Sequence, residues 1–89
     1  MAISGQRAAA IVRRAINNTA PGNNDIKRED TLSDLGIGDV HALDLLEQNI
    51  LYSANYSSVR ITGNLNLKAQ TTYYELYRQV AEKGDLIAA

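Results

Sequence analysis

The sequence contains no cysteine, no phenylalanine and no tryptophan. Without cysteine, the chain cannot form a disulfide, offer a thiolate to a metal or use a cysteine nucleophile. The hydrophobic core must then be built from Leu, Ile, Val, Ala and the five tyrosines. No apolar run approaches the roughly 18 residues of a membrane span. We therefore predict a cytoplasmic protein that does not enter a membrane.

Neither sign of charge is in large excess, because nine basic and ten acidic residues leave a net charge of −1. This balance gives no electrostatic reason to expect nucleic acid or an anionic membrane as partner. The first acidic residue is Asp25, and three arginines precede it: Arg7, Arg13 and Arg14. An organelle transit peptide shares that pattern. We favour a first core helix, since removing these residues would leave too little chain to fold.

The length and composition are typical of one small globular domain. The chain has 89 residues, of which 45% are hydrophobic and 21% charged, so it is globular rather than disordered. We predict a single domain over 1–89, with its core at about 4–83. No internal repeat or low-complexity tract divides the chain.

Two helices are predicted in the first half of the sequence. Ser4 is a suitable N-cap for a helix that ends at about Asn17. Its apolar residues recur at helical spacing: Ala8, Ile11, Val12, Ala15 and Ile16. Asp39 is a suitable N-cap for a second helix from Val40 to about Leu51. Val40, Leu43, Leu46 and Ile50 are expected to line its inner side, while Asp44, Glu47 and Gln48 face away.

The last helix has the clearest signals. Thr72 and Glu75 have the spacing of a capping box, and Gly84 is a natural stop. The apolar stripe of this helix consists of Tyr73, Leu76, Tyr77 and Val80.

The two connections between these helices are less regular. The first is long and contains the apolar anchors Ile26, Leu32, Leu35 and Ile37. In the second, 59–62 and 65–67 alternate around Gly63-Asn64, which predicts either a short hairpin or a loop with one helical turn. The fold class we expect is all-α: a small bundle of three main helices with a short third helix or hairpin before the last one.

The segment from Asp30 to Leu46 reads DTLSDLGIGDVHALDLL. It resembles the acyl carrier protein family, whose pattern is a leucine, a spacer, Asp-Leu-Gly, an aliphatic residue, Asp-Ser-Leu and then a helix with an acid before a leucine. The residues in register are Leu32, Asp34, Leu35, Gly36, Ile37, Val40, Leu43, Asp44 and Leu45. Ile61 is similar to the family isoleucine before the short third helix, and Thr71 to the threonine that opens the last helix. The resemblance implies an acyl-carrier-protein-like fold from about Ile26 to Glu82.

The functional centre of the family is altered in this chain. Members attach phosphopantetheine through the serine hydroxyl, but Asp39 stands at the serine position and Gly38 at the preceding aspartate position. A carboxylate offers no hydroxyl for the phosphodiester. The nearest serines are Ser33, in the preceding loop, and Ser53, beyond the predicted helix. We therefore expect no phosphopantetheine and assign the attachment site to no residue.

Asp39 has two interpretations. It caps the second helix, and its charge favours the positive helix end. Its carboxylate would also lie where the resemblance places the family's phosphate, so it could imitate the charge of a loaded carrier. The acidic helix face, with Asp44 and Glu47, resembles the face that carrier proteins present to basic patches on enzymes. An ordinary solvated helix face is the alternative.

The remaining candidates give no catalytic site. His41 is the only histidine and has no cysteine near it, so we expect no metal. The five tyrosines, Tyr52, Tyr56, Tyr73, Tyr74 and Tyr77, could line a ligand pocket but more commonly supply core bulk. Neither a nucleophile-elbow pattern nor a phosphate-binding glycine loop is present, so we do not expect an enzyme.

The sequence thus predicts a non-catalytic, carrier-like domain that acts by protein contact in or beside a fatty-acid, polyketide or peptide-type biosynthetic system. The expected partner is a protein with a basic patch, bound through Asp39, Val40, His41, Asp44 and Glu47. One alternative is a genuine acyl carrier protein with an atypical loading site. A more distant one is a small helical nucleic-acid binder that uses Arg7, Arg13 and Arg14.

Overall fold

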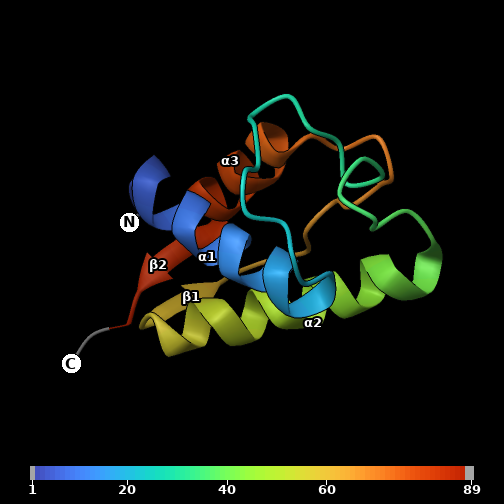
Figure 1. The fold of residues 1–89 in the computed structure, drawn as a ribbon. Helices are drawn as coiled ribbons and strands as arrows, with labels where there is room; N and C mark the ends of the chain where they lie inside the picture. The colour runs from blue at the N-terminus through green and yellow to red at the C-terminus, as the bar shows by residue number, and fades with distance from the viewer. Residues whose placement is uncertain (1, 88–89) are drawn as a thin grey trace.

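A computed structural model describes residues 2–87, so the outermost positions of the predicted 1–89 domain (1, 88 and 89) lie outside the described residues. The elements in chain order are α1 (Gly5–Thr19), α2 (Val40–Tyr56), β1 (Val59–Ile61), α3 (Tyr73–Lys83) and β2 (Gly84–Leu86). Helix α1 packs against both α2 and α3, and Figure 1 shows it lying between them. The fold is mostly helical with a small sheet.

The predicted helix starts are confirmed by their caps. The Ser4 hydroxyl accepts a hydrogen bond from the Arg7 N–H at 3.2 Å, and the Asp39 carboxylate accepts one from the Ala42 N–H at 2.7 Å. Thr72 and Glu75 form the predicted capping box, in which each side chain accepts from the other residue's N–H. These local interactions satisfy N–H groups that a helix end leaves without partners.

The two-stranded sheet corrects the all-α prediction. Strand β1 pairs antiparallel with β2, and Arg60 lies opposite Asp85. The expected local hairpin around Gly63-Asn64 is therefore wrong, because β1 takes its partner from beyond α3. The alternative, a short third helix, is also not observed among residues 57–72.

Gly84 is required by the close packing where the sheet meets α3. A Cβ added there would lie 2.7 Å from the Val80 carbonyl oxygen, closer than side-chain atoms pack. It would also lie 3.1 Å from Cγ1 of Val59 and 3.2 Å from Cδ1 of Ile3. Gly84 ends the helix as predicted, and the lack of a side chain lets three segments meet.

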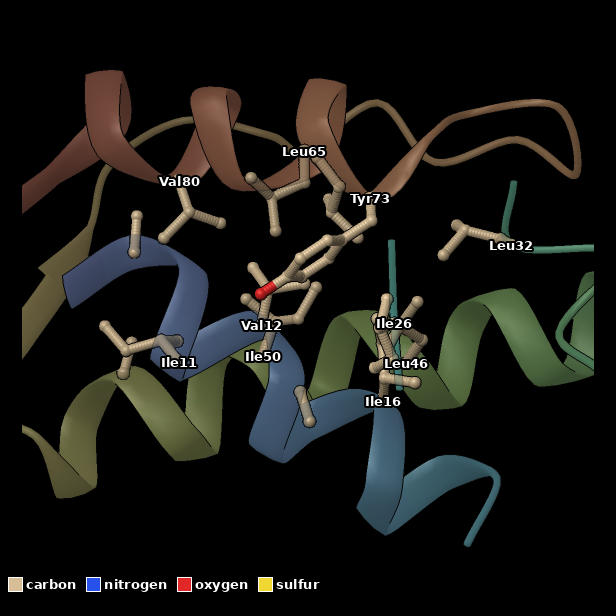
Figure 2. Close-up of a cluster of buried hydrophobic side chains, with 14 of the residues drawn as sticks. Ile11, Val12, Ile16, Ile26, Leu32, Leu46, Ile50, Leu65, Tyr73 and Val80 are labelled. Atoms are coloured by element: carbon tan, nitrogen blue, oxygen red, sulfur yellow. The ribbon is translucent and has the colours of Figure 1, made fainter. Parts of the chain in front are cut away.

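The core is one cluster formed by α1, α2, α3 and both connections (Figure 2). All five predicted apolar residues of α1 are buried, and so are the four anchors of the first connection. In α3 the predicted stripe is confirmed, with Tyr77 only half-buried. The Tyr73 ring lies among core side chains, and its hydroxyl donates to the Ala9 carbonyl oxygen at 2.9 Å. This hydrogen bond links α3 to α1.

Helix α2 departs from its prediction at both ends. Leu46 and Ile50 are buried as expected and Leu43 is half-buried, but Val40 is 76% exposed. The helix also continues past Leu51 to Tyr56, because Ser53 and Ala54 lie in the core. It ends where Ser58 adopts a left-handed backbone conformation with a φ of 60°.

Candidate functional site

The candidate site is the N-terminal end of α2 and the loop that precedes it. The loop begins with a turn held by reciprocal bonds: the Thr31 N–H donates to Asp34 Oδ2, and the Asp34 N–H donates to Thr31 Oγ1, both at 3.1 Å. Side chains of Thr and Asp form this kind of local bond readily. The turn buries Leu32 and directs the chain toward α2.

Gly36 explains why the Asp-Leu-Gly sequence closes this turn. Its φ is 86°, a conformation that costs glycine nothing and a residue with a Cβ much more. The Ile37 N–H then donates to the Leu32 carbonyl oxygen at 2.8 Å, and the Gly36 N–H to that of Ser33 at 3.1 Å. These two bonds form a Schellman motif. The motif returns Ile37 to the core just before α2 begins.

Asp39 caps α2 from an extended backbone conformation and is exposed to solvent. One carboxylate oxygen, Oδ1, accepts from Ala42, while the carbonyl oxygen of Asp39 accepts from the Leu43 N–H at 2.9 Å. The residue thus places a negative charge at the positive end of the helix dipole. The capping interpretation of Asp39 agrees with this geometry.

Ser33 lies closer to this helix end than its position in the sequence indicates. Its Oγ is 3.5 Å from the point where a Cβ on Gly38 would lie. Ser33 is exposed, and its N–H donates to the Ala69 carbonyl oxygen at 3.0 Å. A serine hydroxyl therefore lies beside the start of α2, although not at the position of the family serine.

Backbone hydrogen bonds join the loop to the segment that precedes α3. The Leu32 N–H donates to the Thr71 carbonyl oxygen at 2.9 Å, and the Tyr73 N–H to that of Asp30 at 2.8 Å. Thr31 and Thr72 form an isolated antiparallel bridge. The N-cap of α3 is Thr72, so the resemblance-based expectation that Thr71 opens this helix is shifted by one residue. Ile61, expected before a short helix, lies in β1.

The structure brings the five predicted partner residues together only in part. Asp39, Val40, His41 and Asp44 are exposed, whereas Glu47 is half-buried. Val40, Asp44 and Glu47 follow at spacings of four and three, which places them on one side of α2. We call these three residues the acidic side. His41 lies on the neighbouring side of the helix.

The tyrosines separate into two groups, which corrects the expectation that all five are core bulk. Tyr73 is buried, and Tyr74 and Tyr77 pack edge-on against each other with ring centroids 5.4 Å apart. Tyr52 and Tyr56 are 69% and 71% exposed on α2. Burial raises the pKa of Tyr73, an effect that the nearby Arg13 guanidinium partly offsets.

Two arginines contact Tyr74, and neither contact was predicted from the sequence. The Arg28 guanidinium lies 4.4 Å from the centre of the Tyr74 ring, and Arg78 lies 5.6 Å from the same ring. The spacing of Tyr74 and Arg78, one helical turn, was the available signal. The nearby Glu75 carboxylate accepts from the Thr72 N–H at 3.1 Å and the Thr72 hydroxyl at 2.9 Å, and these bonds lower the Glu75 pKa.

The three N-terminal arginines do not form one basic stripe. Arg14 stacks on the Tyr56 ring at 4.9 Å, while Arg13 lies beside Tyr73 on another side of α1. Adjacent helix residues point about 100° apart, which accounts for this separation. Two of the three arginines are thus used in contacts with tyrosines of the same chain.

The described part of the chain, residues 2–87, brings together no group of three or more His, Cys, Asp or Glu side chains suited to hold a metal. Within the same range, no helix has the length and apolar character needed to span a membrane. Comparison with protein-family models, curated proteins and solved structures found no match. The function must therefore be argued from the geometry of this chain.

Proposed function

We propose that the chain is a non-catalytic, acyl-carrier-protein-like domain of the cytoplasm that acts by protein contact and carries no phosphopantetheine. Its partner would be an enzyme with a basic patch, in or beside a fatty-acid, polyketide or peptide-type biosynthetic system. The proposal depends on one observation: a helix begins directly after the Asp-Leu-Gly turn, and its N-cap is Asp39 rather than serine.

The chemistry of Asp39 supports the absence of a prosthetic group. The serine of a carrier reacts through a hydroxyl oxygen, whereas a carboxylate forms no stable phosphodiester. A helix N-terminus favours an anion at this point. Asp39 supplies that anion permanently, so the domain would present a negative charge at α2 without being loaded.

The acidic side supports contact with a basic protein. Asp44 is exposed and Glu47 half-buried, and α2 has no lysine or arginine to oppose them. The exposed Val40 adds an apolar contact next to Asp44. Charges of this kind steer an oppositely charged partner and set its orientation more than they add affinity.

Intact-mass measurement after incubation with a broad-specificity phosphopantetheinyl transferase tests the first part of the proposal. The natural chain should gain no mass. The double variant Gly38→Asp/Asp39→Ser restores the family pair, and it should be loaded. Its fold should persist, because serine also caps helices and a Cβ at Gly38 meets only ordinary contacts. A mass gain in the natural chain would refute the proposal.

Ser33 is the reason to keep the alternative of a carrier with an atypical loading site. Ser33 is exposed and its hydroxyl lies beside Gly38. This is near the N-terminal end of α2, where a transferase would act on a carrier. Ser33→Ala is therefore the decisive variant if the natural chain is modified. Loss of the mass gain in this variant would establish Ser33 as the attachment residue.

Competition tests the second part of the proposal. The natural chain should slow the loading of a genuine acyl carrier protein by the same transferase, because both would occupy its basic surface. Asp44→Lys should remove this inhibition. Glu82→Lys is the matched control, since Glu82 is an exposed acid on α3 and far from the acidic side in sequence. Equal inhibition by both variants, or no inhibition by the natural chain, would contradict docking through α2.

A further inference from the structure

Asn23 connects the end of α1 to the turn that precedes Asp39. Its side-chain nitrogen, Nδ2, donates to the Ala20 carbonyl oxygen at 2.9 Å and to the Leu35 carbonyl oxygen at 3.1 Å. Leu35 lies 12 residues further along the chain, in the Asp-Leu-Gly turn. One amide group thus joins the segment that leaves α1 to the turn of the candidate site.

A second asparagine, Asn17 in the last turn of α1, holds Asn23 in place. Asn17 Nδ2 donates to the Asn23 carbonyl oxygen at 3.0 Å, and Asn17 Oδ1 accepts from the Asn23 N–H at 3.1 Å. The backbone of Asn23 is therefore bonded on both sides, so its side chain starts from a fixed point. These bonds are partly buried, where a hydrogen bond is stronger than in water.

The glycines around Ile37 explain why the turn needs this connection. Gly36 and Gly38 lie between the turn and Asp39, and glycine adopts either sign of φ readily. The Leu35 carbonyl belongs to the peptide group directly before Gly36. Rotating that peptide group would change the φ of Gly36 from its observed 86° and break the bond to Asn23. The bond therefore favours the conformation that the turn has.

We propose that Asn23 is a positioning residue of the candidate site. It holds the Asp-Leu-Gly turn against the end of α1, and it thereby sets where Asp39 and the start of α2 meet a partner. Asn23 need not touch that partner itself. The effect on partner contact rests on the proposed function, whereas the hold on the turn can be measured in the chain alone.

Asn23→Asp is the sharpest variant for both measurements. It keeps the size of the side chain but replaces the Nδ2 donor with a carboxylate oxygen, which would face two carbonyl oxygens. The matched control is Asn24→Asp, which adds the same charge at the next position, where the side chain is exposed. Asn23→Ala removes the donor without adding a charge, so it decides the question if Asn23→Asp does not fold.

Amide hydrogen exchange of the full chain, followed by NMR, measures the hold on the turn. The N–H groups of Gly36 and Ile37 should exchange at least about tenfold faster in Asn23→Asp than in the control, and about fivefold faster in Asn23→Ala. The N–H of Ile50, in the middle of α2, reports unfolding of the whole domain and should change less. Equal exchange of the turn in the Asn23 and Asn24 variants would overturn the proposal. An equal change at Ile50 would overturn it too, because the loss would then be one of overall stability.

Competition for the transferase measures the effect on partner contact. About threefold more Asn23→Ala than natural chain should be needed for half-inhibition, because a loosened turn presents the binding conformation for less of the time. Asn49→Ala is the control for a merely structural loss. Asn49 Nδ2 donates to Thr19 Oγ1 at 2.8 Å and so joins α2 to α1 without a bond to the turn. This variant should inhibit as the natural chain does.

The two measurements separate failure of this inference from failure of the proposed function. A natural chain that does not inhibit the transferase would refute the proposed function alone, because hydrogen exchange still decides whether Asn23 holds the turn. If the natural chain inhibits and Asn23→Ala inhibits equally well despite a loosened turn, Asn23 does not position the site.

Discussion

The two faces of α2 carry similar kinds of side chain in different surroundings. Leu46 and Ile50 are fully buried, whereas Leu45 and Tyr52, also large, are 44% and 69% exposed. Helical periodicity alone does not separate these faces, since both contain leucines at suitable spacing. The difference teaches that contacts with other elements decide which side of an apolar helix becomes the core.

The comparison has a functional meaning. An inner face is selected for shape, because close packing penalises both cavities and excess volume. An outer apolar side chain contributes little to the isolated domain, and under the proposed function it would be available to a partner protein.

The largest expected effect comes from adjacent leucines. Leu46→Ala should lower the free energy of unfolding by about 2–5 kcal/mol, because it leaves a cavity in the core. Leu45→Ala should cost less than about 1 kcal/mol, since its side chain is 44% exposed. Urea unfolding at low protein concentration measures both. Equal losses in the two variants would show that the faces are assigned wrongly.

An intermediate effect on stability is expected at Asp39, the N-cap of α2. Asp39→Ala removes the side chain that accepts from Ala42 and should cost about 1 kcal/mol of stability. Asp39→Ser retains a capping oxygen and should differ from the natural chain by only a few tenths of a kcal/mol. Thermal unfolding of the three proteins gives the order. If alanine were tolerated as well as serine, the cap would not contribute.

The smallest expected effect is a pH dependence of stability that arises from the buried Tyr73. The folded state raises the pKa of Tyr73 above its ordinary value of 10.0, because burial disfavours the charged phenolate. The stability contributed by the neutral phenol is therefore complete below pH 10, and it decreases as the pH rises through the higher folded value. Urea unfolding across the alkaline range should show this decrease.

Tyr73→Phe provides the control for the alkaline measurement. It keeps the ring in the core but removes the titrating group, so the decrease specific to this residue should disappear. The variant also loses the bond to the Ala9 carbonyl oxygen, at a cost of about 1 kcal/mol. An identical alkaline profile in both proteins would exclude Tyr73 as the origin of the decrease.

Features encoded by neighbouring residues could be predicted from the sequence. Ser4, Asp39 and Thr72 cap the three helices as expected, because a cap needs only a side-chain oxygen and an N–H three residues later. The buried stripe of α1 was also predictable from its spacing. Both kinds of signal are contained within a few turns of chain.

Features that depend on distant residues could not be predicted. The alternation around Gly63-Asn64 suggested a local hairpin, but β1 pairs with β2 instead. The length of α2 was also missed, because Ser58 ends the helix in a left-handed conformation that usually calls for glycine or asparagine. In both places, tertiary packing decides against the local pattern.

The candidate site was predictable in outline but not in detail. The position of Asp39 at the start of α2 followed from local chemistry. The exposure of Val40 and the approach of Ser33 to Gly38 did not, because each depends on how the loop returns to the helix. The exposure of Tyr52 and Tyr56 was missed because the tyrosines were expected to supply core bulk.

The bonds that join the first loop to the segment before α3 affect the order in which the molecule can fold. The Leu32–Thr71 and Asp30–Tyr73 pairs connect opposite halves of the chain, so they form only after a large loop has closed. Helices α1 and α2 can meet while the ribosome is still producing the rest. The loop that presents Asp39 gains these bonds only when the C-terminal third is available, so in an emerging chain this loop is fixed last.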